Sequence, residues 1–369
     1  MLAQNQPAKM WNPKLLLVVS LCISALSVST AASGGKPLVT AITKDASTSL
    51  YTAPLKAGSP LLLDLSGSAI TLTTCTSKTG TTATLSANAT NGQNPLFPVS
   101  FSASVSCAQQ TGLPAGAVGT AGLGPSTQSL TAQVARTQGV ANELALCLPS
   151  DGKSTSGDSV GAAIFGGGPF IFPGRGDFTQ NLAGTAPLVG FNGAPGYFVT
   201  ASAIAIEQGK IGNSGPFVVE LSSTAPYTAL RSDVYAPFVK AFDIAAAGPN
   251  FPWISRVASV APFERCYDST KLPQSLLGYA VPQIDLVLSG GNFSITGGNS
   301  MAQVNSNTAC LGFVQSKATG GQVAAAILSG FQLENRLLVL DNGKHQLGFT
   351  TFLNAVGLSC SNFNFTLGA

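Results

Sequence analysis

The chain of 369 residues carries little charge and a single histidine. Charged residues are only 9% of the sequence, whereas about 25% is usual in a soluble domain. The lysines and arginines are scattered singly, without the basic cluster that a phosphate backbone attracts, so nucleic-acid binding is not expected. The one histidine, His345, excludes most histidine-based zinc sites. We therefore expect no metal and no cofactor.

Long hydrophobic runs are also few. One apolar run, residues 15–26, follows Lys9 and Lys14 and precedes the small residues Ala31 and Ala32. A membrane span is the alternative, but the run is shorter than the roughly 20 residues that a bilayer requires. A basic start, an apolar core and an alanine-rich end are typical of a secretory signal peptide. We predict a signal peptide over residues 1–32 and a secreted, extracellular protein that does not enter a membrane.

Two sets of residues agree with export. An even number of cysteines in an oxidising compartment predicts three disulfides, and six cysteines allow 15 pairings. After the predicted signal peptide the cysteines are Cys75, Cys107, Cys147, Cys266, Cys310 and Cys360. Asn-x-Ser/Thr sequons are candidate glycan sites, and they occur at Asn88, Asn292 and Asn364.

Short β-prone runs broken by Gly, Pro, Asn and Ser dominate the chain, which holds 41 Gly and 22 Pro. This texture predicts a mostly β fold. Apolar residues at three- and four-residue steps predict helices only near residues 129–135 and 231–242, the second with Ser232 or Asp233 as N-cap. The Gly/Pro-rich stretch of residues 190–196 is the candidate boundary between two lobes.

Several motifs resemble those of pepsin-like aspartic proteases. Residues 61–68, Leu-Leu-Leu-Asp-Leu-Ser-Gly-Ser, resemble the first active-site loop of that family, and residues 119–125, 142–149 and 163–168 resemble its plant members. The stretches that most resemble the plant subgroup of TAXI-type xylanase inhibitors are residues 37–51, 260–268 and 278–282. The resemblance implies a monomeric, bilobal, mostly β fold with a few short helices, with lobes over residues 33–193 and 194–369.

The resemblance also indicates that the protease chemistry is lost. That chemistry needs two carboxylates about 3 Å apart that share one proton. Asp64 is present as a relic carboxylate, but Leu65 follows it where the family has Thr or Ser. The second aspartate is replaced, and the register leaves Glu220, Leu221 and Ser222 open as the residue at its position. We therefore expect no peptidase activity.

A deletion in the N-terminal lobe points the same way. In the family a long segment with the flap hairpin follows the cysteine of the first loop, whereas here Cys75 is soon followed by a stretch that resembles a strand beyond the flap. Without a flap, water is not excluded from a bound peptide. The resemblance further implies three disulfide pairs, which are Cys75–Cys107, Cys147–Cys360 and Cys266–Cys310.

The function that the resemblance implies is inhibition of microbial cell-wall glycoside hydrolases, xylanases first, as a plant defence protein of the apoplast or cell wall. In such inhibitors a histidine on a C-terminal loop enters the xylanase active site, and the aligned residue here is Asn354. An amide bonds to carboxylates without supplying a cation. The alternatives are a residual aspartic endopeptidase, a glycoside hydrolase that uses isolated carboxylates such as Asp64 or Glu220, and an extracellular storage or ligand-binding globulin.

Overall fold

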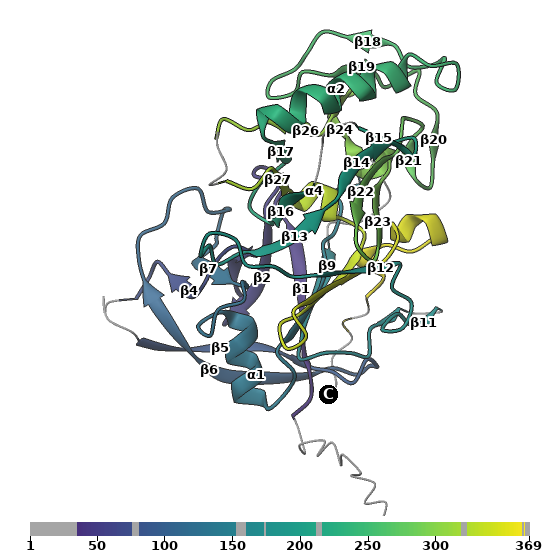
Figure 1. Cartoon of the computed structure of the whole chain (residues 1–369). Coiled ribbons are helices and arrows are strands. Elements are labelled where there is room, and N and C mark those ends of the chain that lie inside the picture. The colour runs from purple at the N-terminus through teal and green to yellow at the C-terminus, as the bar shows by residue number, and fades with distance from the viewer. Residues whose placement is uncertain are drawn as a thin grey trace, which may run out of the picture. The chain divides into compact units, whose positions relative to one another are not determined.

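The computed structural model describes residues 35–75, 81–152, 160–172, 175–211, 216–318, 323–363 and 365 (Figure 1). All of them belong to one compact unit, residues 34–369. The signal peptide predicted for residues 1–32 and the sequon residue Asn364 lie outside the described residues.

The largest sheet has twelve strands in the order β12-β29-β28-β8-β9-β1-β2-β3-β7-β4-β6-β5. They are β1 (Leu38–Lys44), β2 (Tyr51–Lys56), β3 (Ser59–Asp64), β4 (Ile70–Leu72), β5 (Thr81–Ala89), β6 (Phe97–Cys107), β7 (Gly119–Gly122), β8 (Glu143–Cys147), β9 (Val160–Phe165), β12 (Gly184–Pro187), β28 (Leu337–Asp341) and β29 (Gln346–Phe349). Strand β5 also pairs with β1, so seven strands from β1 to β5 in this order close into a barrel.

Strand β6 shows why these segments form strands. Its residues Phe101, Ala103 and Val105 are buried, while the serines between them are exposed. Side chains alternate between the two faces of a strand, so this pattern places the apolar residues inside the barrel and the serines in solvent.

The other sheets are smaller. One joins β13 (Tyr197–Ala201), β16 (Phe217–Leu221), β27 (Ala326–Leu328), β17 (Thr228–Leu230) and β26 (Phe313–Gln315). A second joins β15 (Gly209–Lys210), β14 (Ala203–Ile206), β22 (Ile284–Leu288) and β23 (Gly291–Ile295). A third joins β18 (Arg256–Val257), β19 (Cys266–Asp268), β25 (Thr308–Leu311) and β24 (Met301–Asn305). Two hairpins are β10 (Ile171–Phe172) with β11 (Gly176–Asp177), and β20 (Gln274–Ser275) with β21 (Gly278–Tyr279).

Helices are few. They are α1 (Leu130–Gln138), α2 (Ser232–Ala246), α3 (Gly297–Ser300) and α4 (Gly330–Leu333), with 3-10 turns η1 (Leu353–Val356) and η2 (Cys360–Asn362). The Ser129 hydroxyl caps α1 at its N-terminus, and Gly139 ends it in the left-handed conformation. The N-cap of α2 is Arg231, without a side-chain cap, so the expectation of Ser232 or Asp233 as N-cap was wrong. Asp233 lies in the first turn instead and forms an ion pair with Arg231.

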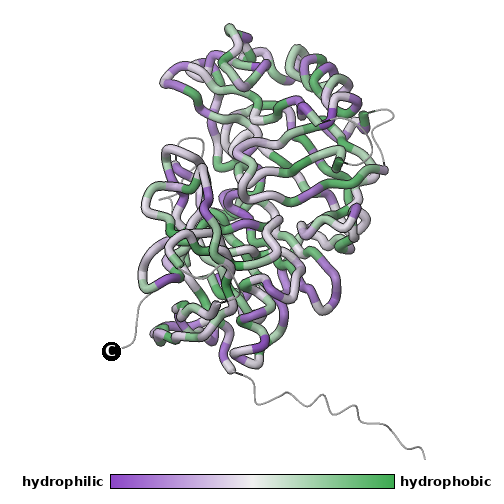
Figure 2. Tube along the Cα trace, turned by 90° about the vertical axis from the view of Figure 1, so that its left-hand side faces the viewer, coloured by the Kyte–Doolittle hydropathy of each residue, from purple (hydrophilic) through white to green (hydrophobic). Residues whose placement is uncertain are grey.

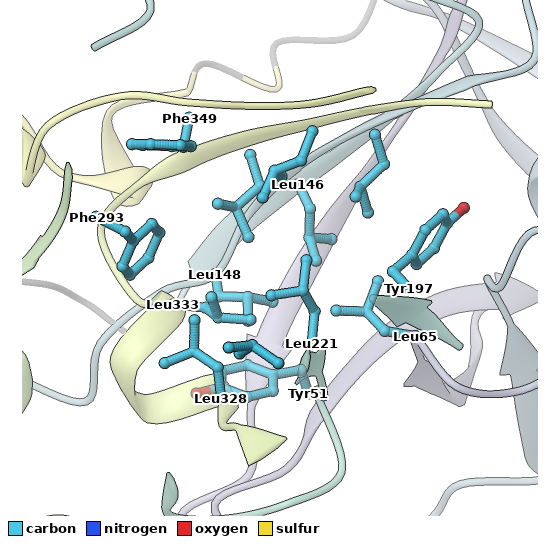
Figure 3. Packing of buried hydrophobic residues seen from close by; sticks show 14 of the residues in the cluster. Tyr51, Leu65, Leu146, Leu148, Tyr197, Leu221, Phe293, Leu328, Leu333 and Phe349 are labelled. Atoms are coloured by element: carbon cyan, nitrogen blue, oxygen red, sulfur yellow. The ribbon is translucent and has the colours of Figure 1, made fainter. Parts of the chain in front are cut away.

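Buried apolar side chains from both halves of the chain form a common core. The tube in Figure 2 is greenest along interior strands and more purple in many outer turns. Figure 3 labels ten members of the main cluster, which are Tyr51, Leu65, Leu146, Leu148, Tyr197, Leu221, Phe293, Leu328, Leu333 and Phe349. Strands β28 and β29 lie in the same sheet as β8 and β9, so late and early segments share a sheet. The boundary between residues 193 and 194 stays a prediction.

The structure contains the three implied disulfides. They are Cys75–Cys107, Cys147–Cys360 and Cys266–Cys310. The second joins β8 to η2 across 213 residues of sequence, and the third joins the neighbouring strands β19 and β25. The strands and helices given above confirm the predicted mostly β fold with a few short helices.

Candidate functional site

Asp64 ends β3 and begins a tight loop. The Ser66 N–H donates to Asp64 Oδ1 over 2.9 Å, and the Gly67 N–H donates to the Asp64 carbonyl oxygen over 3.2 Å. A Cβ on Gly67 would lie 2.8 Å from the Gly122 Cα, so only glycine allows this approach. Burial raises the pKa of the half-buried Asp64 carboxyl, although the backbone N–H groups of Ser66 and Gly67 act in the opposite direction.

The strand pairing around Asp64 defines its position in the N-terminal half. Strand β3 runs parallel to β7, and β4, which follows the loop, runs antiparallel to the same β7. Leu62 and Thr71, nine residues apart, both pair with Thr120. Asp64 therefore lies two residues after Leu62, the first of the two residues that pair with Thr120.

The C-terminal half repeats this arrangement. Strand β16 runs parallel to β27, and β17 runs antiparallel to it. Glu220 and Ala229, also nine residues apart, both pair with Ile327. The residue two positions after Glu220 is Ser222, so Ser222 is the counterpart of Asp64 in this half.

The hydrogen bonds of Ser222 support this correspondence. Its Oγ accepts the N–H of Thr224 over 3.3 Å and that of Ala225 over 3.1 Å, as the Asp64 carboxylate accepts that of Ser66. The side chain is buried, at 4% exposure. Of the three residues that the sequence left open, Ser222 therefore stands at the second position, and its hydroxyl supplies no carboxylate.

The two loops are joined by Ser223. Its hydroxyl donates to the Leu63 carbonyl oxygen over 2.7 Å and accepts the Leu65 N–H over 3.0 Å. Leu65, the counterpart of Ser223 in the first loop, has no hydroxyl to return this contact. Of these two residues, only Ser223 therefore bonds to the opposite loop through a side-chain hydroxyl.

Glu220 is connected to the first loop through a hydrogen bond with Ser66. Its Oε1 accepts the Ser66 hydroxyl over 2.8 Å, so Ser66 bonds to Asp64 through its N–H and to Glu220 through its side chain. The structure therefore brings together two carboxylates that lie 156 positions apart in the sequence. Leu221, between Glu220 and Ser222, points into the core and is 1% exposed.

A buried ionic cluster lies where the two halves meet. Lys44 Nζ is 2.8 Å from Glu334 Oε1 and 3.3 Å from Asp151 Oδ2, and the Tyr51 hydroxyl donates to Glu334 over 2.7 Å. Burial raises the pKa of the Glu334 carboxyl to about 7, although Lys44 and Tyr51 act in the opposite direction. The sequence analysis missed this cluster because its members are scattered singly. A lysine within the apolar strand of residues 38–44 was its one signal.

The side chain of Asn354 is not at the surface, where it would have to lie to enter the active site of a partner protein. It lies in η1 and is only 3% exposed, because its side chain points inward, while Ala355, Val356 and Gly357 are exposed. Direct contact of the Asn354 side chain with a partner's active site does not fit this loop conformation. Of the sequons, Asn88 is half-buried in β5 and Asn292 is exposed on β23.

The described residues contain no group of three or more His, Cys, Asp or Glu side chains arranged to hold a metal ion. No helix in the described ranges is long and apolar enough to span a membrane.

Comparisons with known proteins place both halves in one family. A family model described as xylanase inhibitor N-terminal matches residues 68–167, and one described as xylanase inhibitor C-terminal matches residues 196–351. A rice (Oryza sativa subsp. japonica) protein named Chitinase CLP is 46% identical, covering 96% of this chain and 99% of its own. A Nicotiana benthamiana protein named Probable aspartic proteinase GIP2 is 32% identical, over 77% of this chain and 68% of its own.

Solved structures agree with the fold. The crystal structure of edgp matches with a TM-score of 0.77 and 26% identity, covering 89% of this chain and 98% of that one. The aspartic proteinase from Irpex lacteus matches with a TM-score of 0.57 over 87% of this chain and all of that one, and at 16% identity it shows the pepsin-like fold alone. The rice alignment spans 430 residues whereas this chain has 369, so at least 61 of its positions have no residue here. A shortened chain is consistent with the expected deletion.

Proposed function

Because this chain belongs to the xylanase-inhibitor family of pepsin-like proteins, we propose that it is a secreted, proteolytically inactive member that binds and inhibits a microbial glycoside hydrolase. Ser222 at the position opposite Asp64 supports the loss of proteolysis, since a lone carboxylate cannot form the dyad. The apolar run of residues 15–26 supports export.

The observation that carries the binding role is an apolar surface in the C-terminal half, which we call the C-lobe patch. It consists of Leu276 (61% exposed), Leu277 (39%) and Val356 (42%). Leu277, on the β20–β21 turn, and Ala355, beside Val356, line the same cavity, so the two loops adjoin. Arg175 donates to the Val356 carbonyl oxygen over 2.9 Å and holds the second loop in place. Exposed apolar residues on neighbouring loops are typical of protein-binding surfaces.

The test uses the secreted, disulfide-intact protein and a panel of fungal and bacterial xylanases and glucanases. We expect dose-dependent inhibition of at least one hydrolase, weakened at least tenfold by Leu277→Asp combined with Val356→Asp. Ile244→Asp, on the exposed face of α2, is the matched control and leaves inhibition unchanged. Inhibition that survives the double substitution contradicts the C-lobe patch, and no inhibition of any hydrolase contradicts the proposed function.

A second candidate function is chitin hydrolysis. It is favoured by the printed name of the rice relative and by the two carboxylates that meet at Ser66. Glycoside hydrolases use two carboxyl groups about 5 to 9.5 Å apart, and Ser66 here bonds to the Asp64 carboxylate and to the Glu220 carboxylate. Cleavage of chitin oligosaccharides that is lost in both Asp64→Asn and Glu220→Gln would establish it. Unchanged inhibition in the same two variants would instead establish the inhibitor.

A further inference from the structure

A cavity of about 240 Å³ lies in the C-terminal half. Its polar lining includes Ser294, Thr296 and Arg336, and its apolar lining includes Leu277 and Phe352. At roughly 30 Å³ per water molecule it holds the volume of about eight waters. Pockets for drug-sized ligands begin at about 300 Å³, so this cavity suits a small molecule.

Arg336 is buried in its wall. The residue immediately precedes β28 and is 1% exposed. Its Nη1 donates to the Thr350 carbonyl oxygen over 3.2 Å, and its Nη2 donates to the Ser294 carbonyl oxygen. Within the described ranges the buried Nε has no hydrogen-bond partner. A guanidinium has five N–H donors, so these two carbonyls leave several of them unused, including Nε–H.

In the part of the chain that the structure describes, the positive charge of Arg336 has no direct counter-ion. Among the described carboxylates none lies within 4.0 Å of the guanidinium, and Asp285 acts on it only from a longer range. Burial lowers the pKa of the Arg336 guanidinium to about 9, and the Asp285 carboxylate offsets this in part. The Phe293 ring, 4.5 Å from the guanidinium carbon, adds a cation–π contact. A buried cation without a paired anion is costly, which favours a bound anion.

We propose that this cavity binds a small organic monocarboxylate, with its carboxylate on the Arg336 guanidinium and its apolar body against Phe352 and Leu277. A planar guanidinium matches a carboxylate with two parallel hydrogen bonds. Among the described residues that line the cavity Arg336 is the one cation, which favours a monoanion over a phosphate dianion. Leu277 belongs both to this cavity and to the C-lobe patch, but the proposed ligand binding does not require that the protein inhibit a hydrolase.

The test measures binding of benzoate and of its neutral isostere benzamide to the full secreted chain, by calorimetry and by the ligand-dependent shift of the melting temperature. We expect benzoate to bind at least tenfold more tightly than benzamide. In Arg336→Met, which removes the guanidinium, we expect benzoate affinity to fall at least tenfold. The same measurements on Asn292→Gln exclude interference from a glycan at the cavity edge.

A second variant makes the test independent of how Arg336→Met folds. Asp285→Asn removes the negative charge that acts on Arg336 and should raise benzoate affinity severalfold, with benzamide affinity unchanged. Equal affinity of the wild type for benzoate and benzamide overturns the proposal. So does benzoate binding that persists in Arg336→Met, or that does not rise in Asp285→Asn.

Discussion

Ser222 occupies in the C-terminal half of the chain the place that Asp64 occupies in the N-terminal half. Asp64 ends β3 and Ser222 directly follows β16, each of these strands pairs in parallel with a short partner strand, and each side chain accepts the N–H of the residue two positions later. The serine keeps the hydrogen bonds that close the turn, while the ionisable group is gone. The paired arrangement of the two loops is thus kept, with a hydroxyl in one loop where the other has a carboxylate.

Restoring an acid at this position should make stability depend on pH. In Ser222→Asp the new carboxyl is buried near Asp64, so its pKa in the folded state should lie above the unfolded value of about 3.9. Such a group favours the folded state less as pH rises above 3.9, by about 1.4 kcal/mol for each unit by which the pKa is raised. Urea unfolding at pH 4 and pH 7 measures this, with the neutral Ser222→Asn as control. Equal pH dependence of the two variants would show that the position does not face Asp64.

The Ser223 hydroxyl should contribute more stability than a surface hydroxyl. Ser223→Ala leaves the Leu63 carbonyl and the Leu65 N–H without their partner, which costs about 1–3 kcal/mol of unfolding free energy. Ser223→Thr keeps a hydroxyl and should restore most of the loss. Ser102→Ala, exposed on β6, is the matched control and should change stability by less than about 0.5 kcal/mol. A Ser223→Ala protein as stable as the control variant would contradict a stabilising contact of the Ser223 hydroxyl with the first loop.

Because of Glu334, the unfolding free energy should decrease as the pH rises. Its folded pKa, about 7, lies above its ordinary value of 4.5, so the folded state binds the proton more tightly. The unfolding free energy should then fall between about pH 4.5 and pH 7, by roughly 3 kcal/mol at most. Glu334→Gln keeps an acceptor for Tyr51 and Lys44 and should flatten the profile relative to the wild type in this window. Parallel profiles of the two proteins would be inconsistent with a buried, proton-binding Glu334.

The disulfides should differ in their contribution to stability. Cys147–Cys360 spans 213 residues, whereas Cys75–Cys107 spans 32. In the chain-entropy model the longer loop stabilises more, by about 2 kcal/mol for these two spans. Paired Cys→Ala substitutions of each bridge, compared by denaturant unfolding, test the order. A larger loss for the Cys75–Cys107 pair would show that native packing, and not loop closure, dominates.

Much of the fold follows from local patterns. Alternating residues such as Phe101, Ala103 and Val105 indicate a strand without knowledge of its neighbours. The helix near Leu130 is signalled by Ser129 and Gly139 at its ends. The N-cap of α2 was predicted wrongly because Asp233, a good capping residue by type, pairs with Arg231 instead.

The candidate site followed from the sequence only in part. The resemblance of residues 61–68 to the first active-site loop indicates Asp64 as a candidate, and the absence of any Asp-Thr/Ser-Gly is visible in the printed chain. Which residue replaces the second aspartate depends on the strand register. That register is set by the pairing of β16 with β27, which lie more than a hundred residues apart in the sequence.

The amino-acid sequence alone therefore determined the strand-rich texture and the six cysteines that follow residue 32, because each is a property of residue type and near neighbours, whereas the replacement of the second aspartate was inferred from the resemblance to aspartic proteases. The tertiary structure decided that Ser222 stands opposite Asp64, that Glu220 meets Asp64 at Ser66, that Lys44 joins Glu334, and that Arg336 lines a cavity. These relationships join segments far apart in the chain. They arise from sheet pairing and close packing, which no local pattern of residues specifies.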